Sequence, residues 1–371
     1  MDDVVLLHED PAKLQKMLDI TDKIAKKYHL VFGEEKSKIM TIGTTTKPQL
    51  NLGSMNLEQT NTYKYLGELI TNNKSMENHI NEARRKAEAA YHTILTIAAD
   101  PQLRGIQMET IWKLIETCIV PIITYGAETW RIGKKERTKA NKILDDILKR
   151  ILKTPITVPR EALYIETGLI DVEHTTIKNT INMANRLHIT KNKMLESILQ
   201  NRKQSWTNKV NQEISKQNID KAIVKGPRNP AKTHVQEKIK ENFKRTLEKS
   251  KTKSKIKFLL TNKQKWEPMQ RPAYMNKLSR EQISIIFKTR TRMIDVKNNF
   301  RSKYTDIICR GCGQDNETQE HVLETCTKIH PNDDHKVSID EIFTEDTNIL
   351  TKTAEKIREV MKKLLESEAN P

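Results

Sequence analysis

Residues 309–326 read CRGCGQDNETQEHVLETC and set Cys309, Cys312, His321 and Cys326 in a C-x2-C-x8-H-x4-C pattern. The glycines on either side of Cys312 let the first two thiolates share one turn, and the last two ligands lie about a helical turn apart. Three sulfur atoms and one imidazole nitrogen favour Zn²⁺ over Mg²⁺ or Ca²⁺. The pattern therefore predicts a small CCHC zinc knuckle that depends on its metal for stability. The alternative is a chance cluster of buried thiols.

Two further histidines follow this stretch. His330 and His335 lie close enough in sequence to compete for the fourth ligand position, but the spacing of four residues before Cys326 favours His321. The remaining cysteine, Cys118, stands alone. Cysteines gathered in one short stretch are typical of a metal site in a reducing compartment and not of a disulfide framework.

Composition indicates an α+β chain that is mostly α-helical. The 371 residues are 36% apolar and 30% charged, with only 11 glycines and 12 prolines, and a mean hydropathy of −0.68, which together favour long amphipathic helices. Lys and Arg outnumber Asp and Glu by 65 to 48, giving a net charge of +17, so polyanions are the expected partners. No stretch approaches the roughly 20 apolar residues of a membrane span, and the acidic start does not resemble a signal peptide.

The sequence of the first part of the chain predicts several strands and one helix. Asp2 and Asp3 run directly into an apolar stretch, which we interpret as a buried strand with the two acids at its mouth. Paired carboxylates in that position suit Mg²⁺. The alternative is a solvated acidic terminus. The expected elements are a strand at 4–7, a helix at 10–28 that Asp10 caps, and strands at 38–42, 50–57 and 63–70.

Helical periodicity governs most of the remaining sequence. Apolar residues recur three or four apart in segments that end at prolines or glycines. These predicted helices cover 76–98, 106–118, 134–153, 160–168, 174–200, 278–287 and 348–365. Trp112 and Trp130 stand in apolar surroundings and are expected in the core.

Residues 202–277 differ from their surroundings in charge. Lysines dominate this stretch, so we expect a basic, poorly ordered linker. Its candidate phosphate contacts are Lys238, Lys240, Lys244, Arg245, Lys249, Lys251, Lys253, Lys255 and Lys257. Phe243, Phe258 and Trp266 are the candidates for base stacking. The alternative is a solvated run of charge without a binding role.

Five segments taken in order resemble a known family. MDDVVLL (1–7), EKSKIM (35–40) and YKYLG (63–67) are similar to the second half of a reverse-transcriptase palm. CIVPIITYGAETW (118–130) resembles a segment of non-LTR (LINE-type) retrotransposon polymerases, and 309–326 resembles their C-terminal zinc knuckle. The chain is thus identified as similar to the C-terminal part of such a reverse transcriptase, beginning at its Tyr-x-Asp-Asp box.

The resemblance implies roles for particular residues. Asp2 and Asp3 would hold Mg²⁺ in a nucleotidyl-transfer site, and Lys36 or Lys38 would meet the pyrophosphate, unless these are simply exposed lysines after a turn. The family needs a third carboxylate and fingers that come before this point of the sequence, so no polymerase activity is expected from this chain alone. The parts it implies are a partial palm (1–75), a helical thumb-like domain (76–201) and a helix with the knuckle (278–335). The basic linker (202–277) and the amphipathic C-terminal helix (336–371) follow from charge and periodicity alone and have no match in the family.

Three hypotheses remain open. The chain is a fragment of an RNA-directed DNA polymerase that keeps nucleic-acid-binding parts, or a non-enzymatic, zinc-dependent nucleic-acid-binding protein derived from such an element, or a truncated gene product without a selected function. Both of the first two imply RNA or DNA as partner, no membrane, and no small-molecule substrate beyond the deoxynucleotides of the parent enzyme. The expected location is intracellular, nuclear or cytoplasmic, and family and charge together favour the nucleus.

Overall fold

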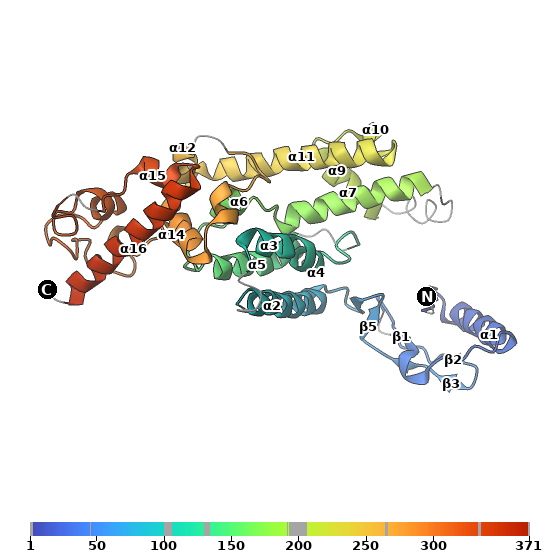
Figure 1. The fold of residues 1–371 in the computed structure, drawn as a ribbon. Coiled ribbons are helices and arrows are strands. Elements are labelled where there is room, and N and C mark those ends of the chain that lie inside the picture. The colour runs from blue at the N-terminus through green and yellow to red at the C-terminus, as the bar shows by residue number, and fades with distance from the viewer. Residues whose placement is uncertain are drawn as a thin grey trace. The chain divides into compact units, whose positions relative to one another are not determined.

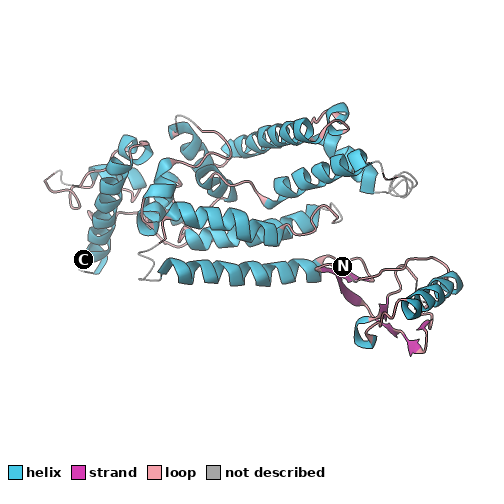
Figure 2. Ribbon diagram, turned by 45° about the vertical axis from the view of Figure 1, so that its right-hand side comes forward, coloured by secondary structure: helices cyan, strands magenta, loops and turns pink. Residues whose placement is uncertain are grey.

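The computed structural model describes residues 3–44, 46–99, 106–129, 134–190, 192, 206–263, 266–332 and 335–369. The chain divides into two compact units, Met1–Ala83 and Arg84–Pro371. Within the described residues, paired strands occur only in the first unit, apart from a single bridge between Ile308 and Asn316 in the second (Figure 2). The predicted mostly helical α+β class is confirmed. None of the described helices is both long and apolar enough to cross a membrane.

Helix α1 (Pro11–Lys27) begins where the sequence predicts. The Asp10 carboxylate accepts a hydrogen bond from the Ala12 amide at 2.9 Å, and proline occupies the first turn, where no amide hydrogen is needed. The helix buries Leu18 and Ala25. Leu18 belongs to a small apolar core with Ile39, Leu50, Leu52 and Leu57, which lie in the strands or next to them.

Short strands form the rest of the first unit. β1 (Lys38–Ile39) pairs in parallel with β4 (Glu58–Gln59), and β2 (Asn51–Leu52) forms a hairpin with β3 (Met55–Asn56). The longest hairpin joins β5 (Thr62–Tyr65) to β6 (Glu68–Thr71). Its two connecting residues, Leu66 and Gly67, both have positive φ, of 47° and 86°, which matches the twist of a tight two-residue hairpin.

The strand predicted at 4–7 is wrong for this structure. Residues 3–8 have no regular secondary structure, and Val4, Val5 and Leu7 are 58%, 47% and 80% exposed. Only Leu6 packs against the apolar core of the unit. A strand needs a neighbour to satisfy its backbone groups, and no described residue pairs with this segment.

The helical part of the second unit follows the predicted periodicity (Figure 1). The described helices are α2 (Glu77–Ala99), which begins in the first unit, α3 (Met108–Leu114), a π-helical turn (Ile115–Ile119), α4 (Val120–Ile123), α5 (Lys134–Ile151), α6 (Arg160–Thr167) and α7 (Val172–Thr190). Trp112 is fully buried, as expected, and its indole nitrogen donates to the Met275 carbonyl at 2.7 Å. Trp130 and residues 193–200 of the predicted 174–200 helix lie outside the described residues.

The basic stretch 202–277 is helical, so the prediction of a poorly ordered linker is corrected. It contains α9 (Trp206–Lys216), α10 (Lys221–Val224), α11 (Arg228–Glu248), a 3-10 turn (Lys249–Thr252), α12 (Ser254–Asn262) and α13 (Ala273–Lys277). The longest, α11, lies beside α7 (Figure 1). It buries one residue in every four: Ala231, Val235, Ile239, Phe243 and Leu247. Because this apolar stripe is narrow, most residues of α11 are polar or charged. The composition of the stretch therefore does not reveal that one side of the helix is buried.

The C-terminal region packs around the last helix. It contains α14 (Arg280–Arg290), a 3-10 turn (Lys297–Phe300), a π-helical turn (His321–Thr325), α15 (Ile339–Phe343) and α16 (Thr347–Ala369). Helix α16 contacts α13, α14, α15 and the π-helical turn. Figure 1 shows α14 and α15 beside it. The helices predicted at 278–287 and 348–365 are therefore present.

A buried carboxylate joins several of these helices. Glu166 of α6 has no exposed surface. Its two oxygens accept from Lys263 at 2.7 Å, from Arg290 at 3.3 Å and from the Tyr274 hydroxyl. Burial alone would raise the pKa of Glu166, but Lys263 and Arg290 lower it to about 2. Arg290 also donates to the carbonyl of Ile342, which ties α14 to α15.

Candidate metal centre

The first two cysteines lie on a tight loop held by backbone hydrogen bonds. The Cys309 amide donates to the Asp315 carbonyl at 2.8 Å, and the Gly313 amide donates to the Cys309 carbonyl at 2.9 Å. Gly313 has a φ of +67°, which favours glycine. A Cβ atom on Gly311 would lie 3.3 Å from the Cys326 sulfur and would crowd Ile329. Both glycines therefore allow the loop to close over the fourth ligand.

The second two ligands lie at the ends of a π-helical turn. The Cys326 amide donates to the His321 carbonyl at 2.8 Å, five residues back. In an α-helix, residues five apart point about 140° away from each other around the axis. The wider turn instead returns Cys326 to the side of His321. Single π-turns of this kind are common at functional sites.

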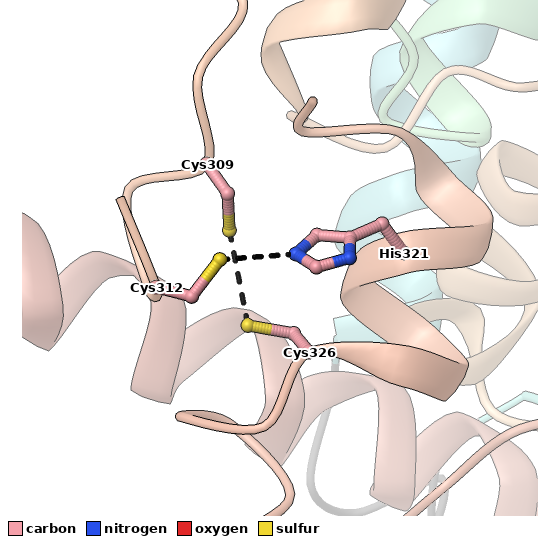
Figure 3. Close-up of side chains that lie close together, drawn as sticks. All are labelled: Cys309, Cys312, His321 and Cys326. Carbon is pink, nitrogen blue, oxygen red and sulfur yellow. Dashed lines mark hydrogen bonds between the residues drawn. The ribbon is translucent and has the colours of Figure 1, made fainter. Parts of the chain in front are cut away.

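The four side chains converge on one point (Figure 3). Their ligand atoms all lie within 4.8 Å of one another. The sulfurs of Cys309 and Cys326 are 3.8 Å apart, and the Cys312 sulfur is 3.4 Å from Nε2 of His321. A tetrahedral zinc ion with ordinary bond lengths needs ligand separations of about 3.8 Å between sulfurs and about 3.5 Å between sulfur and nitrogen. The residues therefore lie close enough to bind a metal ion, and their geometry is compatible with Zn²⁺.

The surroundings of the four ligands act on them in different ways. Nδ1 of His321 is 3.1 Å from the Thr325 hydroxyl, which leaves Nε2 directed at the sulfurs. Burial raises the pKa of the Cys309 and Cys326 thiols. Burial also opposes ionisation of Cys312, but the backbone amides of Asp315 and Gln314 and the ring of His321 lower its pKa to about 7. A dication would stabilise all three thiolates.

A buried ion pair supports the loop from behind. Arg310, between the first two cysteines, donates to Glu317 at 2.7 Å, and Glu317 has no exposed surface. Arg310 also reaches Glu368 of α16 at 2.9 Å and the Asp295 carbonyl at 2.7 Å. The sequence places Glu317 near the metal motif, but the role of Arg310 follows only from the structure.

The competing ligands lie elsewhere. Nε2 of His330 is 2.9 Å from the Val322 carbonyl, and His330 is buried. His335 is exposed, and Cys118 is an exposed free cysteine. Among the described residues, the Cys309, Cys312, His321 and Cys326 group is the one set of three or more potential ligands close enough to share an ion.

The described members of the predicted catalytic set do not belong to a shared group of metal-ligating side chains. Asp2 lies outside the described residues, and Asp3 is exposed. No group of three or more metal-ligating side chains in the described part of the chain includes Asp3. Lys38 forms an ion pair with Glu58 of β4, while the exposed Lys36 uses its carbonyl to accept from the Tyr63 hydroxyl at 2.8 Å.

Seven of the nine candidate phosphate contacts separate into two sets, and Lys240 and Lys255 belong to neither. Four have carboxylate partners at 2.7–3.6 Å: Lys238 and Arg245 with Glu241, Lys244 with Glu267, and Lys253 with Glu161. Lys240 acts electrostatically on Glu267, and partial burial lowers the pKa of Lys255. The second set, Lys249, Lys251 and Lys257, is exposed and has no ion-pair partner among the described residues.

The three aromatic candidates for base stacking differ in how deeply they are buried. Phe243 is 1% exposed and packs edge-on against Tyr164, with ring centres 6.0 Å apart, so its assignment as a base-stacking residue is corrected to core. Phe258 is half-buried between Phe343 and Arg292. Trp266 is also half-buried.

Comparison with known proteins gives one informative similarity. The chain is 23% identical over 164 residues to a putative uncharacterized transposon-derived protein of Caenorhabditis elegans. The match covers 43% of this chain and 57% of that protein, so the chain spans little more than half of its relative. No protein-family profile matches the chain.

Proposed function

We propose that this chain is a zinc-dependent nucleic-acid-binding part of a retrotransposon-derived protein related to LINE-type reverse transcriptases. The convergence of Cys309, Cys312, His321 and Cys326 carries the proposal. The net charge of +17 and the similarity to a transposon-derived protein support it. In this proposal residues 1–75 derive from a palm, 76–201 from a thumb, and 278–335 hold the zinc knuckle.

The unpaired lysines form the proposed contact surface. Lys249, Lys251 and Lys257 stand on the 3-10 turn and the first turn of α12, where each is free to neutralise a phosphate. Binding of this kind is tolerant of sequence and sensitive to salt. The lysines with carboxylate partners would have to break an ion pair first, so they are expected to contribute less.

A salt titration tests the proposal. The affinity of the zinc-loaded chain for single-stranded RNA and for single- and double-stranded DNA would be measured by fluorescence anisotropy at several salt concentrations. Replacing Lys249, Lys251 and Lys257 by Gln should lower the slope of log affinity against log salt by about 2 for a single strand, at about 0.7 per contact. Replacing Lys13, Lys16 and Lys23 of α1, which are equally exposed, is the control with the same charge change. A shallow slope for the unmodified chain would refute the proposal.

The proposed function does not include polymerase activity. The exposed Asp3 is not joined by two further ligands in the described residues, and two-metal chemistry needs carboxylates that converge. Primer extension by the 371-residue chain on an RNA template with Mg²⁺ should stay at background. Deleting residues 1–75 separates the polymerase-fragment hypothesis from the binding-protein hypothesis, because nucleic-acid binding should survive the deletion if the chain acts as a binding protein.

A further inference from the structure

A polar hollow of about 240 Å³ lies between α7 and the start of α11. Pockets for drug-sized ligands are usually about 300–1,000 Å³ and mostly apolar, so this hollow suits a smaller and more polar group. Its lining comes from two helices that lie side by side (Figure 1). Apart from Glu128, the lining residues are Asn179, Asn182, Asn185, Arg186, Arg228 and Lys232.

Helix packing fixes the position of the cations. The Asn185 amide nitrogen donates to the carbonyls of Val224 and Gly226, at 2.7 Å and 3.0 Å. These bonds hold the chain just before α11 against α7. Arg228, the first residue of α11, and Lys232, one turn later, are thereby directed to the hollow.

Several lining groups have no partner. Arg228 and Lys232 form no ion pair or side-chain hydrogen bond with any described residue, and the half-buried amides of Asn179 and Asn182 are likewise unpaired there. Arg186 is 3.8 Å from Glu128. The hollow thus offers donors from two side-chain amides and two cations that are not already used.

The charge of the hollow is strongly positive. Three cations line it against one carboxylate. Neighbouring Lys178 has a lowered pKa, because of burial and because of repulsion from Lys232. The N-terminal turn of α11 adds its own positive end, and Pro227 supplies no side-chain cap. An anion would relieve this repulsion, and guanidinium and amide groups together match the oxygens of a phosphate.

We propose that this hollow is a second nucleic-acid contact, which binds one backbone phosphate through Arg228, Lys232, Asn179 and Asn182. The assignment of the phosphate to a nucleic-acid strand rests on the proposed function. The site itself does not, since a free phosphate offers the same oxygens.

Two matched charge-removal variants test the site in the full zinc-loaded chain. The pocket pair is Arg228→Gln with Lys232→Gln. The control pair is Lys221→Gln with Lys225→Gln, two exposed lysines on and just after α10 that do not line the hollow. The first readout is the melting temperature in inorganic phosphate against chloride of equal ionic strength. Phosphate also stabilises proteins non-specifically, so only the difference between variants is informative.

Phosphate should raise the melting temperature of the unmodified chain and of the control pair more than that of the pocket pair. Equal effects in all three, or none in any, would overturn the site. The second readout is affinity for a single-stranded RNA, which should fall about tenfold in the pocket pair and much less in the control pair. Equal falls in the two pairs would overturn the assignment to a strand.

Failure of the proposed function would be distinguishable. If the unmodified chain bound no nucleic acid, the proposed function and the strand assignment would both fall. The phosphate measurement would then decide on its own whether the hollow is an anion site.

Discussion

Arg310 donates to both carboxylate oxygens of Glu317, through Nη2 to Oε1 at 2.7 Å and through Nε to Oε2 at 3.0 Å. The pair is almost fully buried, with 5% of the arginine side chain and none of the glutamate exposed. Glu317 also accepts from the backbone amides of Arg310 and Lys297, each at 2.8 Å. One carboxylate therefore holds the loop between Cys309 and Cys312 in place.

Breaking this pair should loosen the metal site. Arg310→Met alone should reduce the free energy of unfolding by about 3–5 kcal/mol, because it leaves the buried Glu317 carboxylate without its charged partner. Glu317→Leu should cost less, because Arg310 keeps its ion pair with Glu368. Zinc affinity should fall by about 10–100-fold, as expected for groups that support metal ligands. Urea unfolding and competition with a zinc chelator measure the two effects.

The double variant, Arg310→Met with Glu317→Leu, completes a double-mutant cycle. Its loss of unfolding free energy should be clearly smaller than the sum of the losses in the two single variants, since no charge is left buried. Arg301→Met, at an exposed position, is the control. Additive losses would show that the two residues act independently.

The chain should bind one zinc ion through the four converging side chains. Native mass spectrometry should detect one zinc in the unmodified chain and in Cys118→Ser, whose cysteine is exposed and does not belong to the cluster. Cys309→Ser should lose it. Because metal binding supplies much of the folding energy of small zinc modules, chelation should expose residues 295–345 to protease. Retention of zinc by Cys309→Ser would assign the ion to another site.

Acid should weaken the second unit through Glu166. Its pKa is lowered to about 2 in the folded chain and is about 4.3 when unfolded, so the ionised form contributes about 3 kcal/mol of stability at neutral pH. That contribution is fully present above pH 5 and is lost as the pH falls toward 2. The stability difference between the unmodified chain and Glu166→Gln should therefore shrink over this range in urea unfolding.

Taking this difference cancels the acid sensitivity of the metal site, which both proteins share. Glu359→Gln, at an exposed position, should show no such trend. A difference that stays constant from pH 5 to pH 2 would contradict the role assigned to Glu166.

Replacing a core aromatic residue should lower stability, whereas replacing a binding aromatic residue should lower affinity for RNA. Phe243→Ala should lower the free energy of unfolding by about 3–5 kcal/mol, since it removes a fully buried ring, while the folded fraction keeps its affinity for RNA. Trp266→Ala should change stability less and, if this half-buried ring stacks on a base, should lower affinity by about 1–3 kcal/mol. Thermal unfolding and anisotropy distinguish the two. Loss of affinity in folded Phe243→Ala would return that residue to the binding surface.

The sequence predicts those features that depend on local spacing. The metal ligands are separated by at most 17 residues, from Cys309 to Cys326, and their chemistry requires no knowledge of the fold. The helices likewise follow from the period of their apolar residues. The errors arise where the outcome depends on distant partners. The apolar run after Asp3 has no strand to pair with among the described residues, and the buried stripe of α11 becomes visible only against α7.

The basic surface shows the same limit. A count of lysines does not reveal that Lys253 meets Glu161, which is 92 residues away, or that Lys244 meets Glu267. Sequence therefore overestimates the number of free cations in 238–257. It also does not show the hollow of Arg228 and Lys232, because four of its seven lining residues come from α7.

The π-helical turn at His321–Thr325 makes chain length more critical than side-chain identity at this point. Because its hydrogen bond closes over five residues, removal of any one residue between His321 and Cys326 would restore an ordinary helical repeat and turn one ligand away from the other three. Substitutions at the exposed Thr325 would keep the repeat. In natural variants of this chain, a one-residue deletion here would be more damaging than several replacements.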